Sequence, residues 1–248
     1  DPTAVGYYRT PLQLATLSLF VATSLSVSLF PRVSSWHGQG ETAAIRHALA
    51  RALSYSLLLA VPVVTGGLVL RERLLYFLYG SPFVVATQAF ALLLLAQIGA
   101  VIFVLDSMAL SAVGKPRAVF VINALSCAAL VVLEVALVPA RGITGAAAAV
   151  LAVSIARAAG SRMALFRYTG TRAETGTIGR IAAASLLMGV FVYVLRQLVF
   201  PSSVVVLAGI VIAGALFYFV LLFRLERDLR REVSELVEHL GLPWPSFL

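Results

Sequence analysis

VVATQAFALLLLAQIGAVIFVL, residues 84–105, holds no charged residue in 22 positions. A helix of that length rises about 33 Å at 1.5 Å per residue, which matches the ~30 Å hydrocarbon core of a bilayer. Similar apolar stretches lie on both sides of it along the chain. They cover 12–30, 52–70, 118–138, 144–165, 180–199 and 202–223. The sequence therefore predicts an all-α, polytopic transmembrane helix bundle of about seven spans.

The composition supports the same fold class. Hydrophobic residues make up 60% of the chain and charged residues 12%, and the mean hydropathy is +0.97. A water-soluble domain cannot bury that much apolar surface. The formal net charge is +8, but the arginines fall between the spans and form no RNA-binding motif, so no nucleic-acid partner is expected.

Metal, cofactor and enzyme chemistry have little support in the sequence. The single cysteine, Cys127, lies inside the fourth span and offers no disulfide or CxxC site. The histidines are not spaced as metal ligands. No phosphate-binding loop, HExxH or Ser-His-Asp pattern occurs. We therefore expect no cofactor, no metal and no enzymatic activity.

Lys and Arg are unevenly divided between the two sides of the predicted bundle. One side holds Arg32, Arg46, Arg51, Lys115, Arg117, Arg167, Arg172, Arg180, Arg224, Arg227, Arg230 and Arg231. The other holds Arg9, Arg71, Arg73, Arg141 and Arg196. The positive-inside rule then places the loops 31–51, 113–117 and 166–179 and the C-terminus in the cytoplasm, and the loop 71–83 and the turn 139–143 outside.

The predicted organisation has four parts. Residues 1–165 form a five-span bundle, 166–179 a cytoplasmic loop, and 180–223 two further spans. Residues 224–248 form a cytoplasmic tail, in which 224–240 have the spacing of an amphipathic helix and Trp244 could anchor at the headgroups. The chain begins at Asp1 without Met and has an odd number of spans, so we expect the C-terminal part of a longer polypeptide whose N-terminal lobe is missing.

Several short motifs follow one another along residues 3–165. Val5-Gly6-Tyr7-Tyr8 precedes the first span, which ends Leu29-Phe30-Pro31-Arg32-Val33-Ser34, and Leu78-Tyr79-Gly80 precedes the third. Gly114-Lys115-Pro116 follows, then Leu137-Val138-Pro139 and Gly142-Ile143-Thr144-Gly145-Ala146-Ala147. In this order they resemble the polysaccharide-transporter branch of the multidrug/oligosaccharidyl-lipid/polysaccharide flippase superfamily, whose members move lipid-linked glycans across membranes.

The resemblance implies that helices eight to fourteen of about fourteen are present, with the Gly-Tyr-Tyr element outside and the C-terminus cytoplasmic. The charge count gives the same orientation independently. The implied partners are a lipid-linked glycan substrate, membrane lipids and the missing N-terminal lobe of the same polypeptide. The implied location is the cell membrane.

Polar residues on the first span form a candidate substrate surface. Gln13, Thr16, Thr23 and Ser24 recur at near-helical spacing below Arg9, as expected of a cavity wall. Ser and Thr can equally bond back to helix carbonyls, so both interpretations stay open. Asn123 in the fourth span could face the same cavity or a neighbouring helix.

Ionisable residues inside spans are costly and are the default place to look for function. Asp106 and Glu134 are the candidates for ion coupling, although Glu134 departs from the family pattern, which often holds Asn there. Arg157 is the candidate for binding a pyrophosphate, because a guanidinium matches phosphate oxygens in a bidentate fork. Asp106 and Arg157 are expected at similar depth, where they could form an ion pair.

Two helix features also have structural interpretations. Pro62 should kink the second span, with a transport hinge as the alternative to a static bend. Gly142, Gly145 and residues 146–149 leave little side-chain bulk, which favours close helix packing.

The leading prediction is a flippase that moves lipid-linked oligosaccharide or polysaccharide precursors by alternating access. The alternatives are a cation-coupled multidrug efflux transporter, which would favour acidic groups in the cavity, and a non-transporting scaffold subunit. A membrane glycosyltransferase is disfavoured, because the outer segments carry only the acidic residues Asp1 and Glu72.

Overall fold

Helices account for all the regular secondary structure in the computed structural model, which describes residues 2–201 and 203–225. The elements are α1 (Pro2–Thr16), η1 (Leu17–Leu19), α2 (Phe20–Gly38), α3 (Thr42–Tyr79), η2 (Ser81–Ala86), α4 (Thr87–Ala112), α5 (Pro116–Thr169), α6 (Thr175–Leu198) and α7 (Val204–Leu225). The amphipathic helix predicted at 224–240 and Trp244 fall almost entirely outside the described residues.

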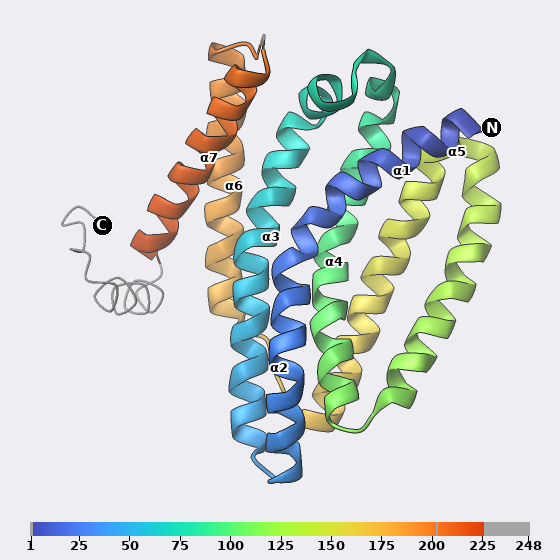
Figure 1. Cartoon of the computed structure of the whole chain (residues 1–248), viewed down its shortest axis with the longest axis vertical. Helices are drawn as coiled ribbons and strands as arrows, with labels where there is room; N and C mark the ends of the chain where they lie inside the picture. The colour runs from blue at the N-terminus through green and yellow to red at the C-terminus, as the bar shows by residue number, and fades with distance from the viewer. Residues whose placement is uncertain (1, 202, 226–248) are drawn as a thin grey trace.

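In the described chain, six helical segments are long and apolar enough to cross a membrane. One of them, α5, is 54 residues long and contains two spans, because the backbone at Gly142 is not helical (φ 55°, ψ −134°). Such a φ is strained for a residue with a Cβ. Figure 1 shows the resulting hairpin of a first arm (116–141) and a second arm (143–169). With α5 counted twice, the prediction of about seven spans is confirmed.

Several helices extend beyond the predicted spans. The expected loops 31–51 and 71–83 are mostly helical, because α2 continues to Gly38 and α3 runs from Thr42 to Tyr79. The expected loop 166–179 shrinks to residues 170–174 between α5 and α6. An apolar window marks only the part of a helix that lies in hydrocarbon, whereas the backbone hydrogen bonds continue into the polar interface.

Helix α4 is the central element of the lobe, with α1, α2, α3 and α5 packed around it (Figure 1). Small residues let α4 approach the second arm of α5. The Ser154 hydroxyl donates a hydrogen bond to the Ala96 carbonyl of α4, and a Cβ on Gly99 would lie 2.7 Å from the Ser154 carbonyl oxygen. The two helices therefore meet almost backbone to backbone.

The small residues after the Gly142 break are also buried, as the sequence predicts: Gly145, Ala147 and Ala149 all lie in the interior. Gly145 stands directly against the backbone of the first arm, where an added Cβ would collide with the carbonyl of Leu137. A side chain at this position would therefore force the two arms apart.

Gly145→Ala is accordingly expected to lower the thermal midpoint of the purified full-length protein, because the carbonyl that it meets belongs to the backbone and cannot rotate away. Overpacking of this kind costs about 1–3 kcal/mol. Gly160→Ala is the matched control on the same arm, since its Cβ would meet nothing closer than Ile122 at 4.0 Å and alanine favours helix. Equal midpoints for the two variants would contradict the packing described here.

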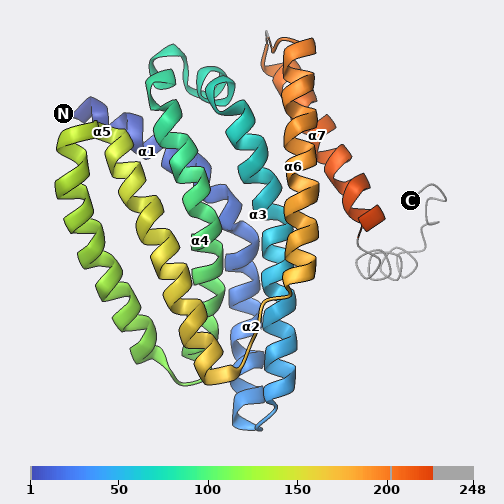
Figure 2. The same ribbon diagram turned by 180° about the vertical axis from the view of Figure 1, so that it is seen from behind.

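Helices α6 and α7 form a hairpin at one side of the lobe, and Figure 2 shows it from behind. The hairpin packs principally against α3. A core of buried residues from all three helices joins them, including Leu58, Leu70, Ile181, Met188, Ile210 and Tyr218. Within the described residues, α3 is thus the element that joins the hairpin to the rest of the lobe.

Candidate functional site

A wedge-shaped space opens between α2, α4 and the start of the first arm of α5, and it is called the polar wedge here because three of its eight lining residues are serines. Its volume is about 430 Å³, and it is lined by Ser26, Val27, Phe30, Val104, Ser107, Met108, Ser111 and Val119. Its three serine hydroxyls each donate back to a carbonyl of their own helix. Each hydroxyl oxygen keeps lone pairs that can accept a hydrogen bond from a ligand or water.

Arg157 lies on the second arm of α5, on the side that faces the first arm. Gly160, three residues further on, points toward Ile122 of the first arm, and residues three apart share a helix face. The Arg157 guanidinium lies over the Phe103 ring of α4, 4.3 Å from its centroid. Phe103 precedes the wedge residue Ser107 by one helical turn, so the ring that contacts the Arg157 guanidinium lies one turn along α4 from the polar wedge.

No carboxylate in the described part of the chain pairs with Arg157. Its Nε is buried without a hydrogen-bond partner. A guanidinium is costly to bury unless it is paired. Arg157 is half-buried, and the contact with the Phe103 ring offsets part of that cost. Within the described residues, Arg157 therefore lacks a counter-charge.

The expected ion pair between Asp106 and Arg157 is wrong, because Asp106 pairs with Arg162. One carboxylate oxygen lies 2.8 Å from Arg162 Nη2, and the other accepts a hydrogen bond from Ser161 Oγ at 3.0 Å. Asp106 is 1% exposed, so the carboxylate is shielded from solvent, and both of these partners come from the second arm of α5. This pairing leaves Arg157 without its expected partner.

Depth and rotation explain the error. Asp106 stands six residues before the end of α4 at Ala112, and Arg162 stands seven before the end of α5 at Thr169, whereas Arg157 stands twelve before it. Asp106 and Arg162 are thus level. Five residues also rotate a helix by about 140°, so Arg162 and Arg157 leave the second arm on different sides.

The predicted stripe on the first span is exposed in this lobe. Arg9, Gln13 and Thr16 are all exposed, and Leu14 and Leu17, on the other side of the same segment, line a separate cavity. Thr16 Oγ1 donates to the Gln13 carbonyl at 2.7 Å. Thr23 and Ser24 also bond back to their own helix. The stripe faces outward from the lobe and contacts none of the other predicted site residues.

The two remaining candidates lie on the first arm of α5. Asn123 is exposed and follows the wedge residue Val119 by one helical turn, so it lies beside the wedge. Glu134 is half-buried and interacts electrostatically with Tyr8 of α1. Asn123 and Arg157 therefore each lie within one or two helical turns of wedge residues or their neighbours, whereas Arg9 and Glu134 lie toward the other end of the lobe.

A second cavity lies on the other side of the α1–α2 span, between α1, α3, α6 and α7. Its volume is about 340 Å³, and almost all of its lining is apolar. Leu14, Leu59, Pro62, Met188, Val192 and Tyr218 are among its walls. The apolar cavity contacts the α1–α2 span at Leu14 and Leu17, and the polar wedge contacts it further along, at Ser26, Val27 and Phe30.

Sequence reasoning missed several residues around these cavities. Ser107 and Ser111 were detectable in principle, since serines four apart in an apolar helix form a hydroxyl stripe. Arg162 carried a signal too, as a second arginine in the same span as Arg157. The sequence carried no signal for Tyr218, because its place in the wall of the apolar cavity depends on which helices it contacts.

Comparison with known proteins now places the chain in a family. The family model described as MatE matches residues 1–137. The chain belongs to the MatE family. The resemblance to the flippase superfamily inferred from the motifs is thereby confirmed.

Two relatives of this MatE chain come from Haloferax volcanii. The probable low-salt glycan biosynthesis flippase Agl15 is 24% identical over 214 residues, which cover 86% of this chain and 45% of Agl15. The probable flippase AglR is 28% identical over 246 residues, covering 96% of this chain and 50% of AglR. The chain spans about half the length of the curated relatives that it matches.

Among solved structures, the lipid II flippase MurJ in its inward closed conformation has a similar fold. The TM-score is 0.75 at 18% identity, over 91% of this chain and 48% of MurJ. This MatE chain therefore has the fold of about half of that transporter.

Proposed function

We propose that this chain is one lobe of a flippase that carries a lipid-linked oligosaccharide or polysaccharide precursor across the cell membrane. Its relatives of about twice the length are named as probable flippases, one of them in glycan biosynthesis. The second lobe would be supplied by the part of the polypeptide that corresponds to the other half of those relatives. The two lobes would enclose the substrate and rock against each other, as in other transporters built from repeats.

The observation that carries this proposal is the unpaired Arg157 beside the polar wedge, with an apolar cavity across the α1–α2 span. A lipid-linked glycan has an anionic phosphate, a polar sugar chain and an apolar tail. Arg157 suits the phosphate, because charge-assisted and bidentate bonds to guanidinium are among the strongest in proteins. The serine-lined wedge and Asn123 suit the sugars, and the apolar cavity suits part of the tail.

The exposed stripe of Arg9, Gln13 and Thr16 has a place in the same scheme. It faces away from the lobe, where the second lobe would close the cavity. We assign it to the wall of the shared cavity, nearer the outer end than Arg157. Glu134, next to Tyr8, lies toward that outer end too and is retained as a candidate for ion coupling.

Efflux of cationic drugs is less well supported. That activity would need a carboxylate available in the cavity, and Asp106 is already occupied by Arg162 and Ser161. Asp106 is accordingly assigned to holding α4 and α5 together. The net charge beside the wedge is positive, which favours an anionic substrate.

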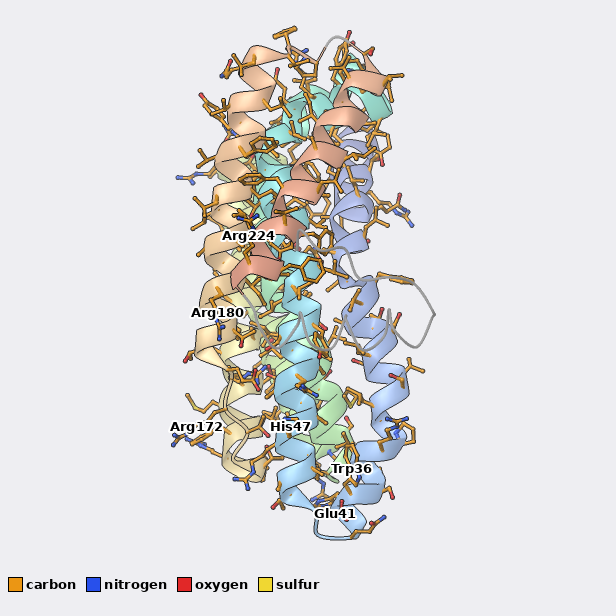
Figure 3. The ribbon with its side chains drawn as sticks, turned by 90° about the vertical axis from the view of Figure 1, so that its left-hand side faces the viewer. Trp36, Glu41, His47, Arg172, Arg180 and Arg224 are labelled. Carbon is orange, nitrogen blue, oxygen red and sulfur yellow. The ribbon has the colours of Figure 1, made fainter. Side chains whose placement is uncertain are left out.

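The orientation proposed places the C-terminus in the cytoplasm. Figure 3 shows Trp36, Glu41, His47 and Arg172 toward one end of the lobe, with Arg180 and Arg224 further along α6 and α7. Helix α3, with 38 residues, is about 57 Å long, and α7, with 22, is about 33 Å. The longer helix projects from the hydrocarbon at the arginine-rich end, as the positive-inside rule requires of a cytoplasmic face.

The test is glycan display in cells that lack the full-length gene. We expect the glycan to be lost from the outer surface while its lipid-linked precursor accumulates inside, and both effects to be reversed by the wild-type gene. Normal display combined with raised sensitivity to cationic drugs would replace the flippase proposal with efflux. Normal display and normal drug sensitivity would favour a non-transporting scaffold.

A further inference from the structure

Pro62 leaves one carbonyl of α3 without its usual partner. In an α-helix each carbonyl accepts a bond from the N–H four residues later, and proline has no N–H. The carbonyl affected is that of Leu58, in a helix that continues on both sides of Pro62. Leu58 is buried, and a buried carbonyl without a donor costs free energy comparable to a lost hydrogen bond.

Tyr218 of α7 supplies the missing donor. Its hydroxyl donates to the Leu58 carbonyl oxygen at 2.8 Å, close to the preferred distance for O–H···O bonds. Tyr218 is 1% exposed and is the largest of the fully buried side chains. A hydroxyl on one helix thus replaces the amide hydrogen that proline removed from another.

This bond is a polar tie between α3 and the α6–α7 hairpin in the interior of the bundle. Further ties lie near the far end of the hairpin. Arg196 Nη1 donates to the Val69 carbonyl at 2.8 Å, and the Arg73 guanidinium lies over the Phe200 ring at 4.3 Å.

The same two residues form part of the wall of the apolar cavity. Pro62 and Gly66 line it from α3, Met188 from α6, and Gly214 and Tyr218 from α7. The distance between α3 and α7 at the Leu58 level therefore sets the width of this cavity, and the hydrogen bond sets that distance.

We propose that Pro62 and Tyr218 form a latch, in which proline exposes a backbone acceptor and tyrosine uses it to position the α6–α7 hairpin and fix the width of the apolar cavity. Tyr218 is thus a positioning residue. The latch concerns the shape of this lobe alone. Only the identity of the cavity's occupant, an apolar chain of the transported lipid, rests on the proposed function.

The latch predicts a specific rescue. Tyr218→Phe removes the hydroxyl but keeps the ring, so it leaves the Leu58 carbonyl unpaired. Pro62→Ala restores an N–H that can bond the same carbonyl within α3. Tyr218→Phe should therefore cost less stability in the Pro62→Ala background than in the wild-type protein, because the Leu58 carbonyl no longer needs a donor from α7.

The experiment measures the distance between spin labels on α3 and α7 of the full-length protein in nanodiscs. Labels at His47→Cys and Val220→Cys, two exposed positions, are introduced with Cys127 replaced by alanine. Tyr218→Phe is expected to broaden and lengthen the distance distribution and to lower the thermal midpoint. In the Pro62→Ala background, Tyr218→Phe is expected to change the distance distribution and the thermal midpoint by clearly less than it does in the wild-type background.

Equal effects of Tyr218→Phe with and without Pro62 would overturn the latch, since the hydroxyl would then act elsewhere. An unchanged distribution in Tyr218→Phe would overturn it as well. Both readouts are independent of transport. A latch that holds in a protein without flippase activity would therefore leave this inference standing while removing the proposed function.

Discussion

Replacing Arg157 by alanine in the full-length protein is expected to slow export of the lipid-linked glycan by about ten- to a hundred-fold. Hydrogen bonds to charged groups contribute roughly 1.5–3 kcal/mol, and every 1.4 kcal/mol corresponds to about a factor of ten. The measurement is the rate at which newly made glycan appears at the cell surface, normalised to the amount of transporter in the membrane.

Two further variants make this test specific. Arg157→Lys keeps the charge but loses the planar fork, so we expect a rate between those of wild type and Arg157→Ala. Arg167→Ala removes an exposed arginine from the same arm of α5 and should leave the rate close to that of wild type. If Arg157→Ala and Arg167→Ala export glycan equally well, Arg157 has no role in binding the phosphate.

Asp106→Ala is expected to cause a large loss of stability. It removes the ion pair with Arg162 and the hydrogen bond from Ser161 together. Breaking a buried pair by removing one partner typically costs about 3–5 kcal/mol. Because Arg162 is 23% exposed, water can reach its guanidinium, and we expect a loss of about 3 kcal/mol at most. The yield of monodisperse protein and its thermal midpoint should both fall.

An exposed ion pair offers the matched control. Glu72 lies 3.9 Å from Arg196 and is 51% exposed, so Glu72→Ala should cost less than about 1 kcal/mol. The double variant Asp106→Ala with Arg162→Ala should be more stable than Asp106→Ala alone, since it no longer leaves the Arg162 guanidinium without its partner. A midpoint for Asp106→Ala as high as that of Glu72→Ala would show that the cluster does not hold α4 and α5 together.

The number of spans was predictable because each apolar window is about as long as the hydrocarbon core is thick. The helix ends were not predictable in the same way. Thr42 and Tyr79 lie far outside the window 52–70, because a helix does not stop where its side chains become polar. The reversal at Gly142 followed from a motif rich in Gly and Pro, although its left-handed φ was visible only in the structure.

The sequence indicated which residues of the candidate site to consider, but it did not indicate which residues they contact. Charge and depth identified Arg157 and Asp106 as unusual residues, and both have unusual environments. Their partners, Phe103 and Arg162, depend on how each helix is rotated about its own axis relative to its neighbour. Residue spacing within one helix does not specify that rotation. The bond between Tyr218 and Leu58 joins residues 160 positions apart. It involves a backbone carbonyl, which carries no side-chain signal in the sequence.

The most direct measurement is flipping of a lipid-linked oligosaccharide by the full-length protein in sealed proteoliposomes, read as the fraction of glycan that a membrane-impermeant glycosidase can cleave over time. We predict that wild type and Arg167→Ala make nearly all of the glycan accessible, and that Arg157→Ala does so about ten- to a hundred-fold more slowly. Accessibility no higher than in protein-free liposomes for the wild type would contradict the flippase proposal.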